Sequence, residues 1–190
     1  MLPLHTSRLL LRPFRASDAE AFSAYRSDPL VARFQGWDVP YGVDKAVAFI
    51  ADSPSPEPPL PGEWYQIAVE LKAGAALIGD CAFAIRVNDP RQAEIGYTFA
   101  RRYHGQGYAT EAVTRLLDYL FGEARLHRVV AFTDVENAAS IRLLERIGMR
   151  REGHFVENVW LKGTWGSEYQ YGLLAREWAG RRPPARPMGK

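Results

Sequence analysis

One stretch of the chain limits the possible folds more than any other: a predicted strand, a loop with two glycines and a long amphipathic helix follow one another. The strand is predicted over Ala93 to Phe99 and the helix from Tyr108 to about Arg125. Gly105 and Gly107 in the loop let the backbone turn tightly and approach a ligand closely. The helix aims free N–H groups and its positive dipole end at this loop, which favours a phosphate or pyrophosphate. A further strand predicted at His127 to Thr133 completes a crossover unit, which indicates a mixed α/β or α+β sheet.

Predicted elements on both sides extend this unit into a mixed, mostly antiparallel sheet flanked by helices. Alternating and β-branched residues predict further strands over Leu9 to Pro13, Trp64 to Leu71, Ala76 to Arg86, Met149 to Leu161 and Ser167 to Leu174. Start and stop signals predict helices after a capping box at Ser17 to Glu20, at Pro29, after Asp44, and from Asn137 to Ile147 before Gly148. Lys72 to Ala75 is a plausible hairpin turn with a bulge near Gly79, and Lys162 to Gly166 is the predicted turn before the last strand.

The length of 190 residues predicts a single domain over residues 1–179, followed by a flexible Arg/Pro-rich tail at 180–190. The proline-rich segment from Ser53 to Gly62 is interpreted as a surface loop rather than a linker, because the segment before it is too small to hold its own core.

Composition excludes several classes of function. The net charge of +2, from 24 basic and 22 acidic residues, is too balanced to indicate nucleic-acid binding. Cys81 is the only cysteine, so neither an internal disulfide nor a multi-cysteine metal site can form, and we expect no metal. No signal-like or membrane-length apolar run occurs, so we expect a cytoplasmic protein without membrane contact.

The two glycines alone are equally typical of an ordinary turn before a helix. The pattern has Thr110 where the dinucleotide-binding fingerprint would have a glycine, and it lacks the lysine of a P-loop.

In fuller context, Arg102-x-x-Gly105-x-Gly107-x-Ala109 resembles the acyl-CoA pyrophosphate loop of the GNAT superfamily of N-acetyltransferases. Further segments are similar to its RimJ/RimL-like branch. In chain order these are Thr6 to Arg12, Glu94-Ile95-Gly96-Tyr97, Gly107 to Ala112, Asn137-x-x-Ser140 followed by Gly148-Met149, and Glu177-Trp178. The matches span roughly residues 6 to 178, so their order is more specific than any one of them.

The resemblance implies acetyl-CoA as the cofactor and direct attack of an amine on the thioester. The acceptor would be a protein N-terminus or a small-molecule amine, and a homodimer is one assembly to consider. In such enzymes the backbone before the loop pairs with pantetheine, and the loop amides hold the pyrophosphate. The implied cofactor contacts are Tyr97, Thr98, Phe99, Arg102, Gly105, Gln106, Gly107, Tyr108, Ala109, Asn137 and Ser140.

The chemistry needs a base for the amine, a donor for the oxyanion and a proton for the thiolate. Glu94 is the first candidate for the base, against the alternative of a solvated strand carboxylate. Ser140 is the candidate that assists the thiolate, although with Asn137 it could simply cap a helix. Many family members place a tyrosine where this chain has Leu144, so a phenolic acid at that position is excluded.

Other residues have plainer interpretations. Weaker candidates for the base are Glu157, Glu168 and Asp80, although a solvated carboxylate is the expected role of each. A solvent-facing side chain is expected at His104 rather than a base, and packing at Cys81. Aromatic residues could line an acceptor pocket or fill a core: Phe34, Trp37, Tyr41, Trp64 and Trp160. The alternatives to an enzyme are a non-catalytic acyl-CoA binding or sensing domain and a nucleotide-binding module of another kind.

Overall fold

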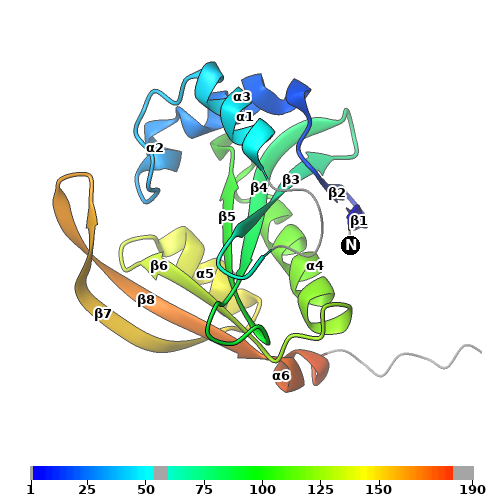
Figure 1. The fold of residues 1–190 in the computed structure, drawn as a ribbon, viewed down its shortest axis with the longest axis vertical. Helices are drawn as coiled ribbons and strands as arrows, with labels where there is room; N and C mark the ends of the chain where they lie inside the picture. Colours follow the sequence, from blue (N-terminus) through cyan, green and yellow to red (C-terminus); the bar gives the residue numbers. More distant parts are fainter. Residues whose placement is uncertain (1, 54–59, 182–190) are drawn as a thin grey trace, which may run out of the picture.

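A single eight-stranded sheet with helices on both faces organises the computed structural model, which describes residues 2–53 and 60–181 (Figure 1). The order across the sheet is β1-β2-β3-β4-β5-β6-β8-β7, and every pair is antiparallel except β5 with β6. The strands are β1 (Leu4–His5), β2 (Leu9–Arg12), β3 (Trp64–Leu71), β4 (Ala76–Ile85), β5 (Gln92–Phe99), β6 (Arg128–Asp134), β7 (Arg150–Leu161) and β8 (Thr164–Leu174). The predicted fold class and the β3-β4-β5 meander are confirmed.

The sheet divides into two arms between β5 and β6. These strands pair only where Gln92–Glu94 meets Arg128–Val130, although β5 continues to Phe99 and β6 to Asp134. Beyond Glu94 each strand keeps its partner on the other side, β4 for β5 and β8 for β6. The edge of β5 that faces β6 is therefore unpaired over its last residues among those the structure describes.

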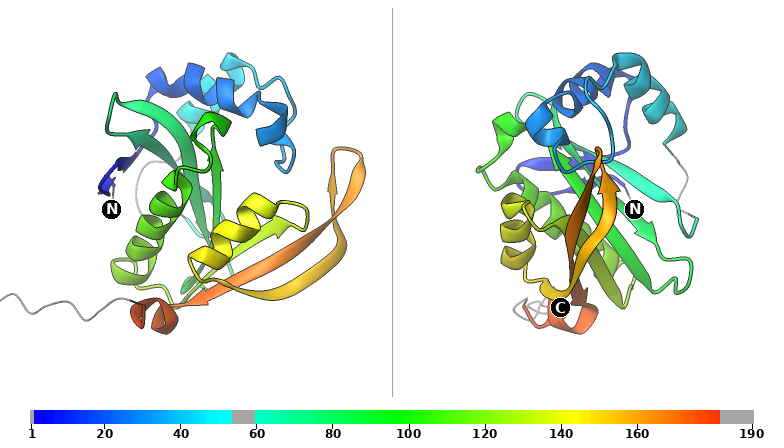
Figure 2. Two further views of the ribbon diagram at one scale, coloured as in Figure 1. Left: turned by 180° about the vertical axis from the view of Figure 1, so that it is seen from behind. Right: turned by 90° about the vertical axis from the view of Figure 1, so that its left-hand side faces the viewer.

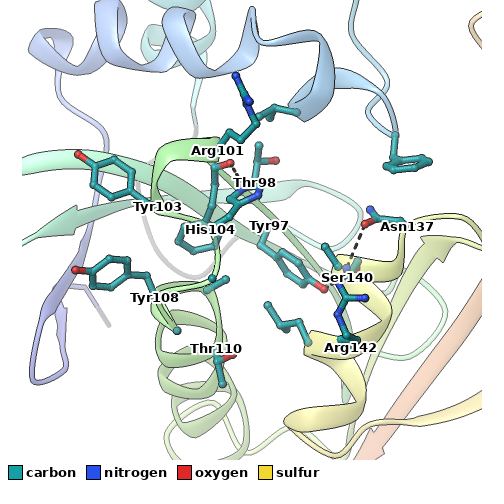
Figure 3. A pocket seen from close by; sticks show the side chains of 18 of the residues that line it. Tyr97, Thr98, Arg101, Tyr103, His104, Tyr108, Thr110, Asn137, Ser140 and Arg142 are labelled. Atoms are coloured by element: carbon teal, nitrogen blue, oxygen red, sulfur yellow. Dashed lines mark hydrogen bonds between the residues drawn. The ribbon is translucent and has the colours of Figure 1, made fainter.

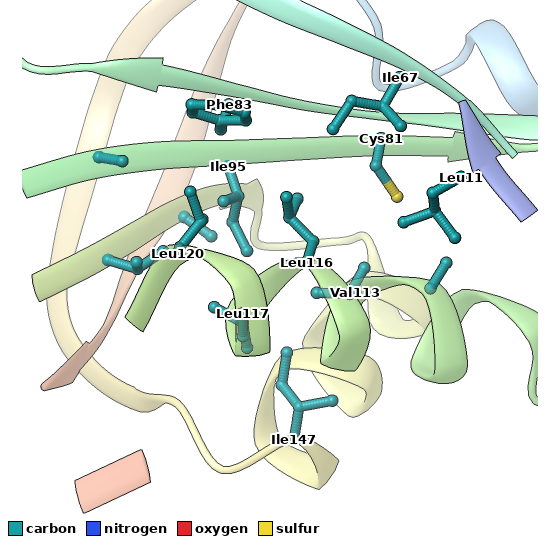
Figure 4. Close-up of a cluster of buried hydrophobic side chains, with 14 of the residues drawn as sticks. Leu11, Ile67, Cys81, Phe83, Ile95, Val113, Leu116, Leu117, Leu120 and Ile147 are labelled. Atoms are coloured by element: carbon teal, nitrogen blue, oxygen red, sulfur yellow. The ribbon is translucent and has the colours of Figure 1, made fainter. Parts of the chain in front are cut away.

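Helices of the two faces build two separate cores. The main core contains the apolar side of α4 (Tyr108–Gly122), whose Val113, Leu116, Leu117 and Leu120 are buried against the sheet (Figure 4). The second core lies under α1 (Ala19–Arg26), α2 (Pro29–Ala32) and α3 (Val43–Asp52). Side chains alternate between the faces of a strand, so Ala68 of β3 belongs to the second core and its neighbours to the first. The remaining helices are α5 (Ala138–Arg146) and α6 (Ala175–Ala179), with short 3-10 turns at Ala16–Asp18 and Arg101–Tyr103.

The β7–β8 hairpin projects beyond the rest of the sheet (Figure 2). Its turn comprises only Lys162 and Gly163, both with positive φ, rather than the five residues expected up to Gly166. A two-residue turn of this kind matches the twist of paired strands. At the tip, Lys162 Nζ donates to the carbonyl oxygen of Ala32 at 2.6 Å, so the hairpin contacts the end of α2.

Several local predictions need correction. The capping box expected at Ser17 is displaced, because the Asp18 carboxylate accepts from the Arg15 amide at 2.8 Å and a 3-10 turn precedes α1. Helix α4 ends at Gly122 rather than near Arg125, and β1 and α6 were not anticipated. The bulge predicted near Gly79 is present. The predicted tail and most of the proline-rich loop lie outside the described residues. No described helix is both long and apolar enough to span a bilayer.

Candidate active site

A groove of about 540 Å³ lies where the two arms of the sheet separate (Figure 3). Its walls come from the end of β5, the glycine loop with the start of α4, the start of α5, and α2 with the residues after it. Of the expected cofactor contacts, nine line it: Tyr97, Thr98, Phe99, Gly105, Gly107, Tyr108, Ala109, Asn137 and Ser140.

The glycine loop presents unpaired amides to this groove. Gly105 and Gly107 have φ values of 74° and 81°, a region that costs glycine little. Gly107 is the N-cap of α4, and no side chain caps the helix there. Within the part of the chain described, the amides of Gly107, Tyr108 and Ala109 donate no hydrogen bond. Free amides at the positive end of a fifteen-residue helix can bind an anion.

Two side chains of the glycine loop form hydrogen bonds with nearby backbone carbonyl groups. The ring Nε2 of His104 lies 2.8 Å from the carbonyl oxygen of Phe99, so this histidine is exposed but not free. Gln106 Nε2 donates to the Arg102 carbonyl at 2.9 Å. Arg102 and Gln106 are not among the residues that line the groove, so their expected contact with the cofactor stays a prediction.

The start of α5 brings a serine and a phenol together on the opposite wall. Asn137 is the N-cap, and its Oδ1 accepts from the Ser140 amide at 3.1 Å. Ser140 Oγ lies 2.7 Å from the hydroxyl of Tyr97, whose ring points across from β5 (Figure 3). Burial raises the pKa of Tyr97, so its phenol remains protonated near neutral pH. From the sequence, only the backbone of Tyr97 was expected to contact the cofactor. Strand alternation predicts that its ring is on the same face as Ile95, but the contact of that ring with α5 could not be predicted without the fold.

Helix α2 connects both arms above the groove through two exposed ion pairs. Asp28, the N-cap of α2, accepts from Arg101 Nε at 2.8 Å on the β5 side. Arg33 Nη2 lies 2.6 Å from Glu136 on the α5 side. Exposed pairs are weak individually, so this connection can open at modest cost.

Glu94 does not line the groove, and its side chain is on the opposite face of β5 from Ile95 and Tyr97. It occupies the last register pair before β5 and β6 separate, and it alternates with Ile95, which is buried in the main core. Its carboxyl is half-buried, and burial raises its pKa; Glu168 adds to the rise while Arg86 opposes it. On this face Trp64 covers Gly96, where an added Cβ would lie 3.6 Å from the ring.

Three other sequence interpretations are settled by burial. Asp80 is not solvated: it is 3% exposed, accepts a hydrogen bond from Tyr25 and lies beneath α1. Cys81 is buried in the main core as expected, and burial raises the pKa of its thiol. Trp37 stacks on the buried guanidinium of Arg26, so it serves packing rather than an open pocket.

Two arginines on α5 that line the groove were not predicted as site residues from the sequence. Arg142 and Arg146 line the groove one helical turn apart and are exposed. Both follow the Asn137-x-x-Ser140 motif at helical spacing, a signal that could have placed them beside an anionic ligand.

Comparison with known proteins places this geometry in a wider group. A family model described as an acetyltransferase (GNAT) domain matches residues 8–150. The uncharacterized N-acetyltransferase p20 of Bacillus licheniformis is 33% identical over 95% of this chain and 100% of its own. A GNAT-family acetyltransferase structure from Bacillus anthracis superposes with a TM-score of 0.83 at 32% identity, covering 93% of this chain and all of that one. The structure of Mycobacterium smegmatis RimJ in complex with CoA-disulfide has a TM-score of 0.73 at 26% identity, covering 89% and 83%.

Relatives with named acceptors match a smaller part of the chain. Spermidine N(1)-acetyltransferase of Vibrio cholerae is 31% identical over 48% of this chain and 53% of its own. The ribosomal protein uS5 alanine N-acetyltransferase of Escherichia coli is 27% identical over 44% and 43%.

Proposed function

Because the chain belongs to the GNAT acetyltransferase family, in its RimJ-like branch, and is thereby an acetyl-CoA-dependent N-acetyltransferase, we propose that the groove binds acetyl-CoA and that a primary amine attacks its thioester from the opposite face of the sheet. The acceptor is a protein N-terminus or a small-molecule amine, the two classes named among relatives.

The observation that carries this proposal is the row of free amides at the start of α4. Gly107, Tyr108 and Ala109 line the groove and their N–H groups are unpaired among the described residues. They suit the pyrophosphate of coenzyme A, and Arg142 and Arg146 supply positive charge on the facing wall. The pantetheine arm would then run along the unpaired edge of β5 at Tyr97 to Phe99 and extend the sheet as an added strand.

The thioester would lie where β5 and β6 separate, between side chains from the two faces of the sheet. The attacking amine must be deprotonated, and Glu94 is a carboxylate at the last paired position of β5 before the separation. Burial raises its pKa toward neutrality, where a general base is more effective. Loss of the amine proton to Glu94 accompanies formation of the C–N bond.

The leaving thiolate would meet Ser140 on the groove side. Either hydroxyl can donate in the 2.7 Å contact between Tyr97 and Ser140 Oγ; with the protonated phenol as the donor, the serine proton would be free for the sulfur. This pair replaces the phenol that Leu144 excludes from α5, since Leu144 is fully buried in the main core.

The test is thiol release from acetyl-CoA across a panel of N-terminal peptides and small amines, together with calorimetric binding of CoA, ATP and NAD. We expect CoA to bind more tightly than ATP or NAD, and turnover on at least one amine. Tight CoA binding without turnover on any acceptor would favour a sensing domain instead, and tighter binding of ATP or NAD would remove the groove from CoA chemistry.

A further inference from the structure

Arg8 contacts the outer side of the glycine loop, although it does not line the groove. Its Nη1 donates to the carbonyl oxygen of Gln106 at 3.0 Å, and its guanidinium lies 4.3 Å from the ring centre of Tyr108. A Cβ added at Gly107 would come within 3.4 Å of its Nη2. This side chain, from the residue just before β2, therefore contacts Gln106 and Tyr108 and lies close to Gly107 between them.

The contact with Gln106 determines which way the next amide points. The Gln106–Gly107 peptide is trans, so its C=O and N–H point in opposite directions. Because the carbonyl faces Arg8 outside the groove, the N–H of Gly107 faces away from Arg8, and Gly107 lines the groove. The dihedral angles of Gly107, φ 81° and ψ 0°, are those of the third residue of a type II turn. Reversing the middle peptide gives the competing type I arrangement, in which this N–H would turn out of the groove.

Glu111 holds Arg8 in place. Its carboxylate lies in the first turn of α4 and accepts from Arg8 Nε at 2.7 Å, from the Arg8 amide at 3.0 Å, and from the hydroxyls of Thr6 and Ser7. Burial opposes ionisation, but these hydrogen bonds prevail and lower the pKa of Glu111 to about 2. The carboxylate is thus ionised over the whole working range of pH, and the guanidinium bridges the helix and the loop that precedes it.

We propose that Arg8 is a positioning residue that selects the orientation of the Gln106–Gly107 peptide in which the Gly107 amide faces the cofactor pyrophosphate. The role rests on the proposed binding of acyl-CoA in the groove. Arg8 acts through the peptide and does not touch the ligand. A cofactor that lacks the pyrophosphate gains nothing from this orientation.

The test compares acetyl-CoA with S-acetylpantetheine, which carries the same thioester and arm without the pyrophosphate. We expect Arg8→Gln to raise the KM for acetyl-CoA about tenfold, the lower end of the range for losing a hydrogen bond to a charged group, with kcat nearly unchanged. The kcat/KM for S-acetylpantetheine should stay within twofold of the wild type, on the order of the noise between variants. Arg8→Lys should fall between, because one ammonium cannot serve both Glu111 and Gln106 as a planar fork does.

Arg91→Gln is the matched control, since it removes an exposed arginine paired with Asp89 in the turn before β5. Equal losses with both donors in Arg8→Gln would show general damage to the fold and overturn the proposal, as would an unchanged KM for acetyl-CoA. If Arg8→Gln does not fold, Arg8→Lys decides by the same comparison. A wild-type enzyme that uses both donors equally well would instead refute the assignment of the loop to the pyrophosphate.

Discussion

Replacing Tyr97 by phenylalanine removes one oxygen atom from the groove and tests how the thiolate is served. The Tyr97 hydroxyl lies 2.7 Å from Ser140 Oγ, and no other hydrogen bond of that Oγ is seen among the described residues. The ring itself is largely buried, so phenylalanine fills the same space and the fold should persist.

The size of the effect follows from the kind of bond lost. A neutral hydrogen bond contributes about 0.5–1.5 kcal/mol, so Tyr97→Phe should lower kcat roughly 2- to 13-fold. Ser140→Ala removes the donor to a developing thiolate, and a bond to a charged group contributes about 1.5–3 kcal/mol, or roughly 13- to 160-fold in kcat. If Tyr97 acts only through Ser140, adding Tyr97→Phe to Ser140→Ala should cost nothing further.

The assay is thiol release at saturating acceptor, with kcat and the KM for acetyl-CoA measured for both single variants and the double variant. Tyr103→Phe is the matched control, because Tyr103 lines the same groove and its hydroxyl makes no hydrogen bond within the described ranges. A loss for Tyr97→Phe that is as large in the Ser140→Ala background as in the wild type would refute the coupling. A change confined to the KM would mean that the phenol binds cofactor and does not assist the leaving group.

Three further predictions test the base and the scaffold. Glu94→Gln should abolish the acid limb of the pH–rate profile, because the wild-type carboxyl gains its charge only as pH rises past its raised pKa. The loss of rate should therefore be greatest above that pKa, where the wild-type carboxylate is ionised, and should shrink below it; an unchanged profile would exclude Glu94 as the base. Arg12→Met should lower the free energy of unfolding in urea by about 3–5 kcal/mol, because it leaves the buried carboxylate of Asp18 without its cation and leaves Glu70 with only the exposed Arg15, at 3.3 Å. Gly79→Ala should lower the free energy of unfolding by about 1–3 kcal/mol in the same assay and raise the KM for acetyl-CoA, since its Cβ would lie 2.3 Å from a carbonyl oxygen of β5. An unchanged free energy of unfolding would show that β4 and β5 can move apart freely.

Local chemistry explains which elements could be predicted. The bounds of β3, β4 and β5 agree with expectation to about one residue, because turn-forming residues stand before β3 and between the successive strands. The apolar period of α4 identified its buried side, as the burial of Leu116 and Leu120 confirms. The turn at Lys162 was predicted three residues too long, because lysine is not among the residues that mark a two-residue hairpin, and the structure nonetheless holds it at φ 49°.

The separation of β5 from β6 could not be predicted in this way. Both strands are apolar and continuous past the point where pairing stops, so nothing in their local pattern distinguishes paired from unpaired residues. The placement of β8 between β6 and β7 likewise depends on partners that are distant in sequence. Only the family resemblance indicated that this part of β5 is a binding site, because the order of its motifs implied a cofactor beside Tyr97 to Phe99.

The exclusion of a phenol at position 144 shows where such reasoning stops. Leu144 does exclude a tyrosine from that position of α5, and its complete burial shows that the side chain there faces the core rather than the groove. The absence of a phenol at position 144 does not mean that the site has no phenol, because the groove between the two arms of the sheet is lined by residues of both arms. Tyr97 enters from β5 and meets α5 at Ser140, 43 residues further along the chain. A chemical group can therefore be lost from one wall and supplied by the other, and only the pairing of elements across the separation reveals it.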